Sequence, residues 1–104
     1  MKLGKAKKTL DDFSDLQPLL KHELEIHEPS EGHSKFWRCY VYVQGSDYFV
    51  VRHWGRNGAK GQQMVESFDS KYQALDAAGK VYGEKLRKGY KAEASPLDKI
   101  VREV

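Results

Sequence analysis

The stretch from Trp54 to Gln62, WGRNGAKGQ, holds the residues whose types and spacing point most directly to chemistry. An indole stands two positions before a guanidinium, and Lys60 follows four positions later. An exposed indole can stack on a sugar or a base while neighbouring cations hold phosphate, and the N–H groups of a glycine-rich turn can add anion contacts. The stretch is therefore a candidate site for a polyanion, with Trp54, Arg56, Lys60 and Gln62 as its contacts.

The same stretch also has a purely structural interpretation. Asn57-Gly58 favours a tight hairpin turn because both residues tolerate positive φ, and Gly55 and Gly61 add freedom around it. A tryptophan at the end of a strand is commonly part of the core. Spacing alone leaves both interpretations open.

Other arrangements of reactive side chains are weak. The histidines at 22, 27 and 33 are five and six residues apart, unlike the short pairs of zinc sites, and Cys39 is the only cysteine. Cys39 alternates with apolar residues, which predicts a buried thiol. No phosphate loop, dinucleotide fingerprint or nucleophile elbow occurs. We therefore expect no metal, no cofactor, no small-molecule substrate, no catalytic residue and no enzymatic activity.

The net charge of +3 is unevenly distributed. Residues 35–91 hold eleven Lys and Arg against five acidic residues, whereas the acidic 21–31 segment holds four glutamates and one lysine. A basic body favours a polyanionic partner, although proteins that bind no nucleic acid also carry such an excess. No apolar run approaches the ~18 residues of a membrane span, and no signal peptide is recognisable. With a single cysteine, the expected location is a reducing one, cytoplasmic or nucleoid-associated.

The elements that must position the candidate site follow from hydrophobic periodicity. Alternation predicts strands over residues 20–28, 35–44, 48–54 and 62–68, with a turn over 55–61. The last of these strands is less apolar, which favours an edge position. Spacings of three and four then predict an amphipathic helix over 71–88, capped by Ser70 and ended by Gly89. The prediction is an α+β fold in which one helix packs on an antiparallel sheet of about four strands.

Three parts of the chain are expected. Residues 1–19 are polar and predicted to be a flexible N-terminal segment. Residues 20–91 form the domain, and residues 92–104 are a C-terminal extension whose LDKIVREV run fits a strand or a short helix equally.

The pattern YFVVRHWGRNGAKGQ, followed by SF, a helix with an early alanine, and EKLRKGY, resembles the WGR domain. The resemblance covers about residues 35–91 and includes the paired aromatics FW at 36–37. This domain occurs in DNA-damage-dependent poly(ADP-ribose) polymerases and in bacterial proteins of the molybdate-metabolism-regulator type. The resemblance implies a non-catalytic module that binds DNA ends or breaks.

The resemblance also implies roles for individual residues. Trp54 matches the tryptophan that packs against sugar and base at a DNA terminus, and Arg56 matches the arginine that contacts the nucleic acid. Lys60, Gln62 and the neighbouring cations Arg52 and Lys88 complete the predicted nucleic-acid-binding set. Asn57 departs from the family, which more often has an apolar residue there. The 104 residues hold no polymerase segment, so a relay through Arg56 has no receiver among them.

Two functions compete at this stage. The first is a module that recognises DNA, or RNA, through the Trp-Gly-Arg turn and its basic surroundings. The second is a protein–protein adaptor that uses an exposed sheet edge or the acidic 21–31 segment.

Overall fold

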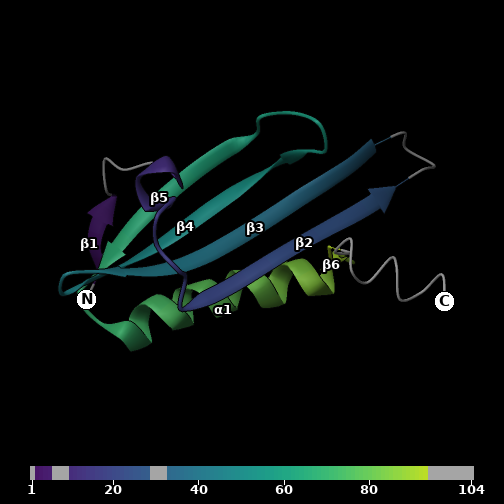
Figure 1. Ribbon diagram of the computed structural model, residues 1–104. Coiled ribbons are helices and arrows are strands. Elements are labelled where there is room, and N and C mark those ends of the chain that lie inside the picture. The colour runs from purple at the N-terminus through teal and green to yellow at the C-terminus, as the bar shows by residue number, and fades with distance from the viewer. Residues whose placement is uncertain (1, 6–9, 29–32, 94–104) are drawn as a thin grey trace, which may run out of the picture.

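The computed structural model describes residues 2–5, 10–28 and 33–93 of the 104. Over these residues the chain forms one antiparallel sheet of six strands in the order β1-β5-β4-β3-β2-β6, and helix α1 lies across one face of it (Figure 1). The predicted α+β class, with one helix packed on an antiparallel sheet, is confirmed.

The four long strands are the four that the sequence predicts. The Trp-Gly-Arg signature, however, lies inside a strand and not in the turn. Gly55 and Arg56 still pair with Phe36 and Lys35 of the neighbouring strand, so the ladder fixes the direction of each side chain as far as Arg56. The strands are β2 (Leu20–Glu28), β3 (His33–Gln44), β4 (Asp47–Arg56) and β5 (Gln62–Phe68).

Two short strands were not predicted. β1 (Lys2–Lys5) pairs with the end of β5, from Glu66 to Phe68, and β6 (Lys91–Ala92) pairs with β2 at Leu24 and Glu25. Neither is long enough to show a period-two signal. Within the described ranges, β1 covers only part of β5, so β5 is an edge strand over its first residues.

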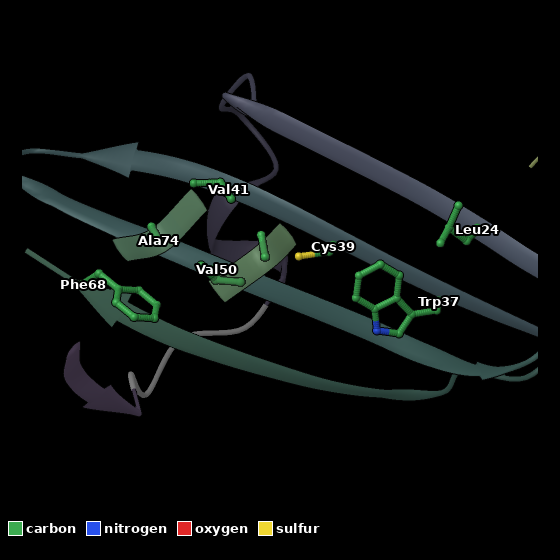
Figure 2. Close-up of a cluster of buried hydrophobic side chains, with 8 residues drawn as sticks. Leu24, Trp37, Cys39, Val41, Val50, Phe68 and Ala74 are labelled. Carbon is green, nitrogen blue, oxygen red and sulfur yellow. The ribbon is translucent and has the colours of Figure 1, made fainter. Parts of the chain in front are cut away.

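Each face of the sheet has its own apolar cluster. Figure 2 shows the helix-side cluster spread along the strands, with Ala74 of α1 near Val41, Val50 and Phe68, and with Trp37 and Leu24 farther along. On the opposite face, the 3-10 helix η1 (Leu10–Phe13) inserts Phe13, which is fully buried and stacks on Tyr42 with ring centroids 4.9 Å apart. Part of the 1–19 segment therefore packs on the sheet. The helix-side cluster comprises Leu24, Trp37, Cys39, Val41, Val50, Phe68, Ala74 and Ala78.

Helix α1 (Lys71–Arg87) runs along the sheet, and its last turn lies toward the end of the sheet that carries the β4–β5 turn (Figure 1). The Ser70 side chain accepts a hydrogen bond from the backbone N–H of Gln73, and Gly89 follows the helix with a φ of +103°. Ala74 and Ala78 are completely buried, and these small side chains let the helix approach the sheet closely. No helix in the described residues is long and apolar enough to cross a membrane.

Candidate nucleic-acid interface

Trp54 lies on the helix side of the sheet, near the end of β4. It pairs with Trp37 of β3 on one side and with Gln62 of β5 on the other. Its side chain packs against the helix-side cluster but is only partly buried. The core therefore fixes the indole while part of it stays accessible, as a stacking platform requires.

The turn after β4 depends on two glycines that touch each other. A Cβ on Gly61 would lie 2.4 Å from the carbonyl oxygen of Trp54, and a Cβ on Gly55 would lie 2.8 Å from the Cα of Gly61. Gly61 also has a φ of +77°, a conformation that side chains rarely adopt. These glycines serve the close backbone crossing that brings β5 back beside the indole.

Hydrogen bonds anchor this turn to the neighbouring strands. The backbone N–H of Asn57 donates to the carbonyl of Ser34 over 2.9 Å, and its side-chain amide donates to the Ser34 hydroxyl. His53 donates from Nε2 to the carbonyl of Lys60 over 2.7 Å, since a carbonyl can only accept. The departure from the family pattern at Asn57 thus replaces apolar packing with polar anchoring.

Two cations face each other across the strands beside Trp54. Lys35 and Arg56 are direct partners in the β3–β4 register, and alternation places both on the face that carries Trp54. Like charges directly opposite in a sheet are destabilising. Within residues 2–5, 10–28 and 33–93, no carboxylate forms an ion pair with either side chain. The two cations therefore stand opposite each other without a described carboxylate to neutralise them.

The end of α1 adds further positive charge. Burial lowers the pKa of Lys85, and the nearby charges of Lys88 and Lys35 lower it further. Its ammonium lies 5.4 Å from the centroid of the Tyr90 ring, and no described carboxylate pairs with it. Lys88 is the exposed C-cap residue. Lys85 lies beside Trp54, and the charges of Lys35 and Lys88 are close enough to Lys85 to act on it.

Arg52 lies deeper than the sequence suggested. Its guanidinium nitrogen Nη1 is 3.1 Å from a carboxylate oxygen of Glu66, and the two side chains are only 16% and 8% exposed. The Nε–H of Arg52 is buried and has no acceptor among the described residues. Arg52 therefore lies beneath the surface that the other cations form, between the sheet and α1.

The structure brings together some of the predicted contacts and separates others. Trp54, Arg56 and Gln62 share the helix-side face at one end of the sheet, Lys88 lies at the adjoining end of α1, and Lys60 is exposed on the turn. Sequence reasoning missed Lys35 and Lys85. Only the β3–β4 register and the docking of the helix bring these two lysines to Trp54, so a local motif carries no sign of them.

The other reactive groups lie elsewhere. Cys39 is fully buried, and burial raises its thiol pKa to about 11. No group of three or more potential metal ligands occurs in the part of the chain that the structure describes. On the side opposite α1, Arg38 donates two hydrogen bonds of 2.9 Å to Glu93 and lies over the ring of Phe36. These contacts hold structural elements together.

The fold and the site define a small binding module built on an antiparallel sheet. A family model described as the WGR domain matches residues 20–96, most of the chain. The crystal structure of a Bacteroides fragilis protein from the Northeast Structural Genomics Consortium is 32% identical, with a TM-score of 0.58. The match covers 77% of this chain and 21% of that protein, so this chain spans about a fifth of its length. No curated protein matches.

This chain therefore belongs to the WGR-domain family. WGR domains are small non-catalytic modules that generally bind nucleic acids.

Proposed function

We propose that this WGR domain binds DNA at ends or breaks through Trp54 and the cations around it. The observation that carries the proposal is the direct opposition of Lys35 and Arg56 beside a partly exposed indole. A fold gains nothing from like charges held across two strands. A polyanion passing over this end of the sheet would neutralise both charges and convert the repulsion into affinity.

The expected division of labour follows from charge and shape. Lys35, Arg56, Lys85 and Lys88 would contact phosphates, which supply affinity without sequence preference. Trp54 would stack on a terminal sugar or base, which a continuous duplex does not expose. Lys60 and Gln62 flank this path from the turn and from β5. No described helix is presented for reading the major groove, so little sequence specificity is expected.

The test is equilibrium binding of fluorescent linear duplex, with closed-circular DNA of the same sequence as competitor. If the four cations each neutralise one phosphate, the slope of log K against log salt is about −3.6, or roughly a hundredfold loss between 50 and 200 mM salt. The Trp54→Ala/Arg56→Ala variant should lose end preference and most of its affinity. Lys71→Ala, which removes an exposed cation from the first turn of α1, is the matched control. Salt-independent binding, or equal binding by the double variant, would refute the proposal.

A second candidate is a protein–protein adaptor that uses the β2 edge. Among the described residues β6 pairs with β2 at Leu24 and Glu25, and the N–H of Glu93 donates to the carbonyl of Glu23, which leaves the two ends of β2 for a partner strand. Lys21, Glu23 and Glu25 project charge from this strand, which discourages promiscuous pairing. Capture of a partner protein that survives nuclease treatment and high salt would favour this candidate.

Binding to RNA would be detected by repeating the equilibrium-binding assays described for DNA with RNA duplexes.

A further inference from the structure

A small hollow opens beside Trp54, between the sheet and α1. Its volume is about 170 Å³. It lies on the same face of the sheet as Lys35 and Arg56, and Trp54 in its wall is two positions from Arg56 in β4. Its walls come from β3, β4, β5 and α1, and they are Trp37, Arg52, Trp54, Met64, Val81 and Lys85.

The walls combine flat apolar surface with two cations. The Trp54 indole, Met64 and Val81 offer planar and aliphatic contact area, which suits a flat ring. Arg52 contributes a guanidinium that Glu66 holds in place. A purely apolar occupant would make no use of this guanidinium, and a bare phosphate would make no use of the Trp54 indole.

Lys85 connects the hollow to the surface. It lines the hollow, is partly buried, and lies close enough to Lys35 and Lys88 for their charges to lower its pKa. A phosphate at the mouth of the hollow would offset that crowding. The site thus combines an apolar wall with a flat ring and a guanidinium inside with clustered positive charge outside, in the arrangement of a nucleobase joined to its phosphate.

Building on the proposed function, we propose that the hollow receives the base of one unpaired nucleotide at the DNA end. Arg52 donates to an acceptor on the edge of the base, Trp54 and Met64 contact its ring, and Lys85 holds the adjoining phosphate. The preferred ligand is then an end with an unpaired nucleotide, and a blunt end must fray by one base pair to fill the hollow.

The experiment compares two duplexes with equal numbers of phosphates. One carries a single-nucleotide overhang with a base, and the other carries the same overhang without the base. Stacking of one base on aromatic side chains predicts about 5- to 150-fold tighter binding of the first duplex in fluorescence anisotropy. Val81→Phe, which fills the hollow without changing charge, should bring the ratio close to one and leave binding of the baseless duplex unchanged. Val43→Phe, on the same face toward the other end of β3, should preserve the ratio.

A second measurement needs no variant. With 2-aminopurine as the overhanging base, insertion beside the indoles should quench its fluorescence, whereas 2-aminopurine paired inside the duplex should respond little. Equal affinity for the two overhangs, or no quenching, would overturn the inference. If binding stays salt-dependent and sensitive to Arg56→Ala, that result leaves the proposed function standing. If none of the DNA ligands shows salt-dependent binding, the proposed function itself is overturned.

Discussion

Replacing Lys35 with glutamine should make the domain more stable and, at the same time, a weaker DNA binder. Lys35 lies directly opposite Arg56 in the β3–β4 ladder, on the same face, and no described carboxylate separates the two charges. Direct cross-strand pairs are worth roughly 0.2–1 kcal/mol, and like charges make that contribution unfavourable. Removing one charge should therefore raise the free energy of unfolding by about 0.5 kcal/mol, which corresponds to roughly 2–4 °C in Tm for a domain of this size.

The effect on binding can be worked out from counterion release. One lost phosphate contact should make the salt slope shallower by about 0.9, so affinity at 0.1 M salt should fall roughly eightfold. Lys35→Glu should widen both differences, because it creates an opposite-charge pair with Arg56 and repels phosphate. Lys71→Gln, with the same loss of charge far from the β4–β5 turn, should change neither quantity by a comparable amount.

Salt distinguishes charge repulsion from other causes of the change in stability. The Debye length is about 10 Å at 0.1 M and 3 Å at 1 M, so the gain in Tm for Lys35→Gln should shrink at high salt. The measurements are thermal unfolding by circular dichroism at both salt concentrations and fluorescence anisotropy with linear duplex. A lower Tm for Lys35→Gln at low salt, or a gain that salt leaves unchanged, would show that the two charges do not repel each other as the register implies.

Three further predictions concern the structure around the site. Gly61→Ala should lower the free energy of unfolding by at least about 2 kcal/mol in urea titrations, because its Cβ would meet a backbone carbonyl of β4 at 2.4 Å, whereas Gly58→Ala, with open space around it, should lose only about 1 kcal/mol. Glu66→Gln should cost roughly 3 kcal/mol by leaving the charge of Arg52 buried without its counterion; unchanged stability would contradict that assignment. Burial raises the thiol pKa of Cys39 to about 11, so the folded state holds the proton more tightly than the unfolded state does. The free energy of unfolding should therefore fall by up to ~1.4 kcal/mol per pH unit as the pH rises from about 9 toward 11. Cys39→Ala should abolish that component of the pH dependence.

The main elements of the fold could be predicted because each carries its own periodicity. Alternation over residues 20–28 and 62–68 located β2 and β5 to the residue, and the stripe after Ser70 located α1. The short strands β1 and β6 and the 3-10 helix around Phe13 have no such signal. Their residues are held by partners far away in the chain, as when Phe13 stacks on Tyr42, and such contacts cannot be read from a local window.

The sequence marks only part of the candidate site, for the same reason. Trp54 and Arg56 belong to one contiguous motif, so the sequence singles them out. Lys35 and Lys85 reach that motif only through strand register and helix docking, and nothing in their neighbourhoods marks them. Strand alternation also decides whether a predicted cation is displayed on the surface, as Arg52 shows. Because it lies on the face that α1 covers, its charge is balanced by Glu66 inside the molecule and not displayed on the surface.

The contacts that hold the β4–β5 turn in place are different from the opposed charges of the candidate site. The turn can therefore stay rigid although those like charges lower the stability expected of the free domain. The turn is held by backbone crossings at Gly55 and Gly61 and by hydrogen bonds from Asn57 and His53, none of which requires a net charge. The repulsion is concentrated where Lys35 and Arg56 oppose each other, at an end of the sheet that solvent and salt can screen. A ligand that binds only the folded state raises the free energy of unfolding. Because salt screens the two charges, a polyanion that neutralises them should raise this free energy most at low salt. If the proposed function holds, the same opposed charges should favour a ligand that carries several phosphates over a single anion.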